Sequence, residues 1–115
     1  MKSQIYHNPR CSKSRQTLQL LEDNNIDTEI VEYLQNPPDA ETLEKILTQL
    51  GIEPRQLIRT NEAEYKELGL DNPDLGRASL IDAMIKTPKL IERPIVITDK
   101  GIAIGRPPEN ILKVL

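Results

Sequence analysis

Aromatic residues, cysteine and histidine are scarce in this sequence. It contains no Phe, no Trp, three Tyr, one Cys and one His. The shortage of aromatic side chains argues against a platform on which nucleic-acid bases stack. One Cys cannot form an internal disulfide, and one Cys with one His cannot build a structural zinc site. We therefore expect no metal and a reducing, cytoplasmic setting.

Long apolar runs and an excess of positive charge are also missing. No apolar run approaches the roughly 20 residues of a membrane span, and Met1 to Gln4 lead straight into a strand-like segment. We expect neither a membrane anchor nor a signal peptide. The net charge is −3, from 15 basic and 18 acidic side chains, which argues against a general nucleic-acid binder. The 115 residues have the length of one domain, residues 1–115.

The charges that are present are unevenly distributed. Residues 1–21 hold four basic side chains and no acidic one, whereas residues 22–53 hold nine acidic side chains and one Lys. The one cysteine, Cys11, lies in the basic segment. The pattern therefore suggests a local positive field around a thiol.

The first third of the chain predicts a β-α-β unit. Residues 4–7 are typical of a short strand, which Asn8-Pro9 ends. A helix is predicted from Cys11 or Ser12 to Asn24-Asn25, and the alternation of polar and apolar residues in 27–33 predicts a second strand. This order favours a parallel pair of strands.

The rest of the chain predicts a run of helices, then a β-hairpin, then a last helix. Helices are predicted from Asp39 to Gly51 and over 54–58, 61–68 and 77–86, with Asp39 as an N-cap. Residues 93–98 and 102–104 predict the hairpin, and the last helix starts at Pro108. The order predicts an α/β, thioredoxin-like three-layer fold: a small mixed sheet flanked by helices, with an inserted helical region at about residues 39–90. Other α/β plans share this order.

Cys11 is the first candidate for chemistry. It lies at the predicted start of a helix, where unpaired backbone N–H groups and the helix dipole stabilise an anion. Arg10, Lys13 and Arg15 add positive charge. These features lower the pKa of a thiol, and the thiolate is the nucleophile. We expect Cys11 to be reactive, rather than a buried, inert cysteine.

Two neighbours of Cys11 are candidates to act on the thiolate. Ser14 stands where a C-x-x-C redox motif has its second Cys, so it cannot resolve a disulfide but can donate a hydrogen bond. The role of an ordinary helix N-cap fits Ser12 or Ser14 equally well. His7, if protonated, would further favour the thiolate, although a hydrogen-bonded or surface histidine fits its position equally well. With no second thiol in the chain, a redox cycle needs an external thiol such as glutathione.

Three arginines are candidates for binding an oxyanion: Arg59, Arg93 and Arg106. Arg93 and Arg106 each precede a proline, which restricts them to extended conformations. The planar guanidinium suits tetrahedral oxyanions. Pro94 opens the third strand, where thioredoxin-like folds have a cis-proline, so we predict a cis Arg93-Pro94 bond.

The sequence resembles the glutaredoxin-coupled arsenate reductases, the ArsC-like family, along essentially its whole length. The segments that carry the resemblance are His7–Arg15, Tyr33-Leu34 with Pro37-Pro38, Leu57–Arg59, Tyr65–Leu70, Ile91–Val96 and Gly105–Pro107. The family has a thioredoxin-like fold with an inserted helical region. This sequence departs from the family pattern at Arg10–Lys13, because family members that act in arsenic resistance carry small residues around the cysteine.

The resemblance implies roles for particular residues. Cys11 attacks arsenic, His7 and Ser14 help to hold the thiolate, and Arg59, Arg93 and Arg106 bind the oxyanion. Glutathione, as co-substrate, then attacks the Cys11 adduct, and glutaredoxin reduces the mixed disulfide. The implied protein binds arsenate, glutathione and glutaredoxin and has no bound cofactor. The sequence itself does not fix the oligomeric state, and we expect a monomer.

Two alternatives share the fold. A glutathione-dependent thiol-disulfide reductase would use Cys11 without needing Arg59 or Arg106. A regulatory protein-binding module, similar to the Spx type that binds RNA polymerase, is the other, although those proteins carry a C-x-x-C switch that Ser14 removes. The acidic segment 22–53 would then be the partner surface, though such segments are more often solvated.

Overall fold

The computed structural model describes residues 2–115, and their backbone contacts group into two compact units. Of the described residues, the first unit contains 2–36 and 93–115, and the second contains 37–92. The second unit coincides within two residues at each end with the helical insertion predicted at about 39–90. None of the helices among residues 2–115 has the length and apolar character needed to cross a membrane.

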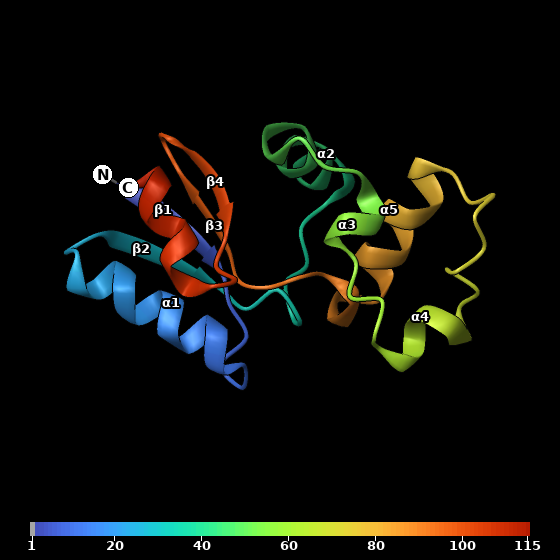
Figure 1. Ribbon diagram of the computed structural model, residues 1–115, viewed down its shortest axis with the longest axis horizontal. Helices are drawn as coiled ribbons and strands as arrows, with labels where there is room; N and C mark the ends of the chain where they lie inside the picture. The colour runs from blue at the N-terminus through green and yellow to red at the C-terminus, as the bar shows by residue number, and fades with distance from the viewer. Residues whose placement is uncertain (1) are drawn as a thin grey trace. The chain divides into compact units, whose positions relative to one another are not determined.

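The first unit is built on a four-stranded mixed sheet (Figure 1). Its strands are β1 (Lys2–Tyr6), β2 (Asp27–Val31), β3 (Ile95–Thr98) and β4 (Gly101–Ile104), in the order β2-β1-β3-β4. β1 pairs with β2 in parallel, as the β-α-β pattern predicted, and the hairpin strand β3 pairs antiparallel with both β1 and β4. β2 ends at Val31, earlier than the predicted residue 33, because residues 32–36 turn away through hydrogen bonds to the Glu32 carbonyl.

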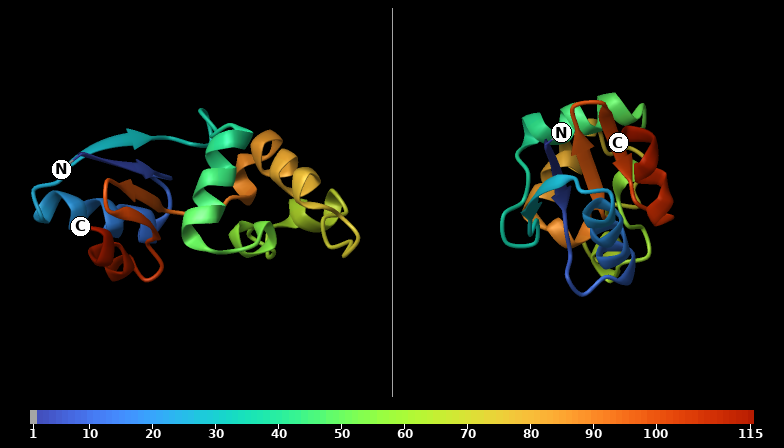
Figure 2. Two further views of the ribbon diagram at one scale, coloured as in Figure 1. Left: turned by 90° about the horizontal axis from the view of Figure 1, so that it is seen from above. Right: turned by 90° about the vertical axis from the view of Figure 1, so that its left-hand side faces the viewer.

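The helices of this unit are α1 (Ser12–Asp23) and a 3₁₀ segment, η2 (Pro108–Val114). Figure 2 shows both on one face of the sheet. The core between them takes one or two buried side chains from each of β1, α1, β3, β4 and η2: Ile5, Leu21, Val96, Ala103, Ile111 and Val114. Because the sequence contains no Phe or Trp, the burial of these aliphatic side chains provides the hydrophobic driving force for folding. The third layer of the predicted fold stays a prediction.

The second unit contains α2 (Ala40–Leu50), α3 (Pro54–Leu57), α4 (Ala63–Glu67), α5 (Arg77–Lys86) and η1 (Pro88–Leu90). Asp39 caps α2 as predicted, because its Oδ1 accepts a hydrogen bond of 2.8 Å from the Thr42 N–H. Gly51 ends α2 in the left-handed conformation, with φ of 67°, which a side chain would disfavour. α5 packs against α2, α3 and η1. The residue that follows α3 and the residue that follows η1 pair in an antiparallel bridge, between Ile58 and Ile91.

Candidate functional site

Cys11 itself is the N-cap of α1 and closes the loop that follows β1. Its N–H donates to the Asn8 carbonyl at 3.0 Å, and its carbonyl accepts the first helical hydrogen bond, from the Arg15 N–H at 3.0 Å. The Nη1 of Arg15 also donates to the Pro9 carbonyl at 2.9 Å, which braces the loop. The cysteine is partly exposed. Its sulfur therefore lies at the positive end of a 12-residue helix and is accessible to a small reactant.

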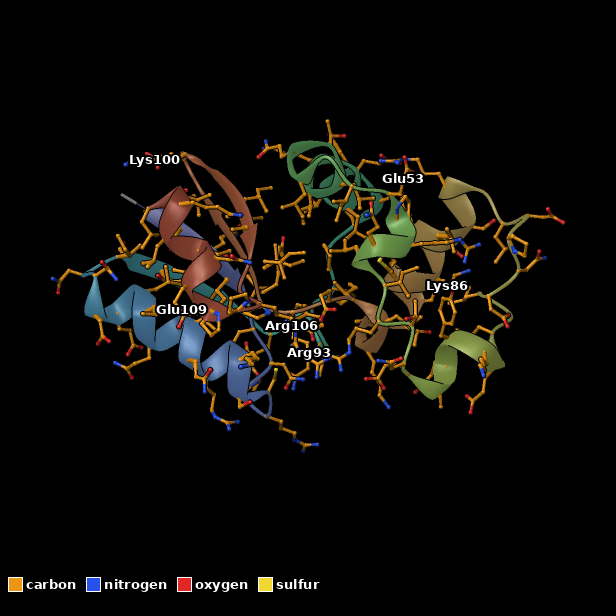
Figure 3. The ribbon with its side chains drawn as sticks, viewed as in Figure 1. Glu53, Lys86, Arg93, Lys100, Arg106 and Glu109 are labelled. Atoms are coloured by element: carbon orange, nitrogen blue, oxygen red, sulfur yellow. The ribbon has the colours of Figure 1, made fainter. Side chains whose placement is uncertain are left out.

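Arg106 is the cation that reaches the sulfur. Its Nη1 lies 3.9 Å from Cys11 Sγ and 3.2 Å from the Arg93 carbonyl, to which it also donates. Figure 3 shows Arg93 and Arg106 close together at the end of the sheet where β3 begins. The predicted cis peptide between Arg93 and Pro94 is confirmed, and a second, unpredicted one joins Arg106 to Pro107. Two of the three predicted arginines thus lie in the same unit as Cys11 and are linked by a hydrogen bond.

A close backbone approach joins the hairpin to α1 beside this site. Thr17 on α1 lies against Gly105, and its Oγ1 donates to the Lys13 carbonyl at 2.8 Å. A Cβ added at Gly105 would collide with Thr17 Oγ1 and would lie 2.8 Å from the Cγ of Pro94. The residue before Arg106 therefore has to be glycine for the chain to pass this close to α1.

His7 and Ser14 contact each other rather than the sulfur. Nδ1 of His7 lies 2.6 Å from Ser14 Oγ, and the Asn8 N–H donates to the same hydroxyl at 3.0 Å. Ser14 is completely buried and His7 is 6% exposed. Within residues 2–115 the structure shows no hydrogen bond from Ser14 to Cys11 Sγ. Ser14 therefore fixes the loop between β1 and α1, and neither Ser12 nor Ser14 is the N-cap.

The surroundings of His7 bear on its protonation state, which the sequence left open. Burial lowers the pKa of His7 from its usual value of 6.5, and Arg15 lowers it further, while the Glu32 carboxylate acts in the opposite direction. The neutral imidazole is therefore favoured near neutral pH. Of the two interpretations that the sequence left open, the structure favours a buried, hydrogen-bonded histidine.

Arg59 lies in the helical unit, where two carboxylates hold its side chain. Its Nε donates to Glu62 Oε1 at 3.1 Å, and its Nη1 lies 3.6 Å from Glu92 Oε1. Its backbone N–H donates to the Leu90 carbonyl at 2.7 Å. Any oxyanion bound by Arg59 has to share the guanidinium with these carboxylates. That Arg59 joins Arg93 and Arg106 in one binding set stays a prediction.

The sequence carried no signal for two of these features. Glu32 acts on His7 because β2 pairs with β1, and the His7 N–H donates to the Val31 carbonyl at 2.9 Å. Arg15 was predicted only as one of several cations near the thiol, whereas its guanidinium holds the loop through Pro9. Both relationships depend on backbone pairing and loop shape.

Comparison with known proteins decides the family. The model of the ArsC family matches residues 6–114 of the chain. The chain belongs to the ArsC family. The match includes all six candidate residues of this ArsC-family protein, from His7 to Arg106.

Close relatives of this ArsC-family chain are known from several bacteria. The Escherichia coli strain K12 protein YfgD, whose name states no activity, is 51% identical over 112 residues, which are 96% of this chain and 94% of the relative. The arsenate reductase of Neisseria meningitidis serogroup A is 50% identical over 112 residues, 96% of each chain. The solved structure of an arsenate reductase from Vibrio cholerae is 46% identical, with a TM-score of 0.96 over 100% of this chain and 98% of that one. The ArsC-like thioredoxin fold is therefore established for this chain.

Proposed function

We propose that this protein reduces arsenate to arsenite, with the Cys11 thiolate as nucleophile and with glutathione and glutaredoxin as the source of electrons. The observation that carries the proposal is the contact between Arg106 and Cys11, with Nη1 3.9 Å from Sγ. A guanidinium at this distance can both stabilise a thiolate and bind an oxyanion that the thiolate attacks. The names of relatives such as the Neisseria enzyme support the choice of arsenate.

The first step is attack of the thiolate on arsenic. A bond forms between Cys11 Sγ and arsenic, and an oxygen leaves as hydroxide or, after taking a proton, as water. Arsenic remains at the +5 oxidation level in this adduct. Arg106 and Arg93 balance the negative charge on the remaining oxygens, and Arg59 supplies the third cation of the set.

The second step transfers two electrons to arsenic. The glutathione thiolate attacks Cys11 Sγ, a disulfide bond forms, and the electron pair of the sulfur–arsenic bond stays on arsenic, which leaves as arsenite. A glutaredoxin thiolate then attacks the glutathione sulfur of this mixed disulfide and releases the Cys11 thiolate. The absence of a second cysteine from the sequence supports this route, because the chain has no thiol of its own to resolve the adduct.

The test is a coupled assay with glutathione, glutaredoxin, glutathione reductase and NADPH, to which arsenate is added last. We expect NADPH consumption that depends on arsenate and disappears in Cys11→Ser, while Ser12→Ala, an exposed neighbour, retains it. Arsenate-dependent turnover by Cys11→Ser would refute the proposal.

Alanine substitutions at the arginines separate this function from a glutathione-dependent thiol-disulfide reductase. Arg59→Ala and Arg106→Ala remove guanidinium groups that an oxyanion needs and that a disulfide substrate does not. Loss of turnover in both variants supports the oxyanion site. Full turnover on a mixed disulfide, with no response to arsenate in the wild type, would support the thiol reductase.

A further inference from the structure

A hollow of about 340 Å³ lies beside the loop that ends at Cys11. We call it the β1–β2 hollow, and its lining residues are His7, Asn8, Pro9, Arg10, Glu32, Leu34 and Gln35. Its volume falls in the range of about 300 to 1,000 Å³ that is usual for small-molecule sites. All of its walls belong to the sheet-containing unit.

Backbone hydrogen bonds fix the hollow relative to Cys11. The Asn8 carbonyl in its wall accepts the Cys11 N–H at 3.0 Å, and Arg10 immediately precedes the cysteine. The opposite wall follows β2, and the His7 N–H joins it to β1 through the Val31 carbonyl at 2.9 Å. A ligand in this hollow therefore lies next to the loop that presents the reactive sulfur.

The two walls carry opposite charges. The first wall holds the Arg10 guanidinium, and the second holds the Glu32 carboxylate; both residues are exposed. Within residues 2–115 neither side chain forms an ion pair or a side-chain hydrogen bond, and the one partner of the Glu32 carboxylate is its electrostatic interaction with His7. Both side chains can therefore bind a charged ligand. Leu34, which is 44% exposed, adds an apolar surface, and Gln35 adds an amide. The hollow thus suits a small zwitterionic molecule with a carboxylate, an ammonium group and a peptide backbone.

We propose that the β1–β2 hollow binds the peptide thiol that reacts at Cys11, a molecule of the glutathione class, with a carboxylate on Arg10 and the ammonium group on Glu32. The inference rests on the proposed function, in which an external thiol must approach the sulfur. It adds a binding site for that co-substrate on the β2 side of the loop, separate from the Arg106 guanidinium that contacts the sulfur.

A second hollow provides an internal comparison. It measures about 350 Å³, lies at the other end of β1 and β2, and is also lined by both charges, including Lys2, Asp27 and Glu29. Because Cys11 follows the opposite end of β1, a thiol bound there would be remote from the sulfur. Lys2→Ala is therefore a matched control for Arg10→Ala: each removes an exposed cation from a mixed-charge hollow of similar size.

The experiment measures binding of S-methylglutathione, which has no free thiol, to the wild-type protein by isothermal titration calorimetry. We expect Arg10→Ala to raise the Kd about tenfold, as loss of one charge-assisted hydrogen bond does, and Lys2→Ala to leave it within about twofold. Glu32→Gln should raise the Kd for S-methylglutathione but not for its N-acetyl derivative, which lacks the ammonium group. Equal Kd values for wild type, Arg10→Ala and Glu32→Gln would overturn the proposal, as would equal weakening by Arg10→Ala and Lys2→Ala.

The coupled assay separates this inference from the proposed function. If both hold, Arg10→Ala raises the KM for glutathione about tenfold and leaves the KM for arsenate within about twofold. If the wild type ignores arsenate but binds S-methylglutathione in an Arg10-dependent way, the hollow is a glutathione site and the choice of arsenate is wrong. If arsenate is reduced and the KM for glutathione is the same in wild type and Arg10→Ala, the inference about the hollow is wrong.

Discussion

Arg106 directs Nη1 at the sulfur of Cys11 across 3.9 Å, although the two residues are 95 positions apart in the chain. The same nitrogen donates to the Arg93 carbonyl at 3.2 Å, so the guanidinium is held between the sulfur and the start of the hairpin. An arginine in this position is oriented before any oxyanion arrives. Preorganised cations of this kind stabilise developing charge without reorganisation during the reaction.

Replacement of Arg106 tests that geometry. We expect Arg106→Ala to lower kcat/KM for arsenate about 100-fold, the usual effect of removing one charge-stabilising donor. Arg106→Lys should recover only part of the loss, because an ammonium group lacks the planar fork that can serve Cys11 and Arg93 together. Lys113→Ala, on η2, is the control for loss of one positive charge. If kcat/KM falls no further in Arg106→Ala than in this control, Arg106 acts only through its positive charge and not through its position beside the sulfur.

The two serines at the start of α1 predict different effects on stability. Ser14→Ala removes the buried hydroxyl that serves His7 Nδ1 at 2.6 Å and the Asn8 N–H at 3.0 Å. We expect it to lower the free energy of unfolding by about 2 kcal/mol, because both partners lose a hydrogen bond. Ser12→Ala, at an exposed position, should change it by less than about 0.5 kcal/mol. Urea denaturation at pH 7 measures both, and equal values would argue against the structural role of Ser14.

Protonation of His7 should destabilise the fold at mildly acidic pH. Burial lowers the pKa of His7 below 6.5 in the folded state, so the unfolded chain binds the proton first as the pH falls. The free energy of unfolding therefore decreases from above pH 6.5 down through the folded-state pKa. His7→Gln removes this contribution, and the wild type should lose more stability than the variant between pH 7.5 and 5.5.

Two charged groups near His7 change the size of the expected loss of stability. The Glu32 carboxylate raises the pKa of His7 and so reduces the effect, and Arg15 increases it. Carboxylates with lowered pKa values, such as Asp39, lose their contribution only at more acidic pH, so they do not mask it. Parallel pH profiles for wild type and His7→Gln would contradict a neutral, buried imidazole.

The contact between Gly105 and Thr17 predicts a non-additive pair of substitutions. A Cβ at position 105 would collide with Thr17 Oγ1 and press on Pro94, so we expect Gly105→Ala to cost about 1 to 3 kcal/mol of unfolding free energy. Thr17→Ala removes the colliding atoms. The double variant should therefore be more stable than the sum of the single changes predicts, as a double-mutant cycle by urea denaturation would detect. Strict additivity would show that the two elements do not approach this closely in solution.

Several local features followed from the sequence because they depend on near neighbours. The first strand ends at Tyr6, one residue before the predicted end at His7, and a helix starts one residue after Cys11. Asp39 caps α2, and Gly51 ends it. The helix predicted over 77–86 matches α5 (Arg77–Lys86). In each case the chemistry of a few consecutive residues limits the backbone to one solution.

Other predictions were incomplete because they needed packing information. The last helix is a 3₁₀ segment, and its Ile111 and Val114 close the core. The sequence left two roles open for Ser14, a hydrogen bond to the thiolate one turn back or the N-cap of the helix. Ser14 bonds instead to His7, because the loop places the imidazole over the buried face of α1. Sequence spacing along a helix does not reveal which of two nearby polar groups a buried hydroxyl will meet.

The sequence by itself determined that the one cysteine stands at a helix start in a basic segment, within an α/β chain that has an inserted helical region. These properties come from composition, turn residues and periodicity, which act over a few residues. Only the tertiary structure decided which charged groups reach that cysteine. The pairing of β3 with β1, and the approach of Gly105 to Thr17, bring Arg106 to the sulfur, because strand register and close packing join segments that are distant in the chain.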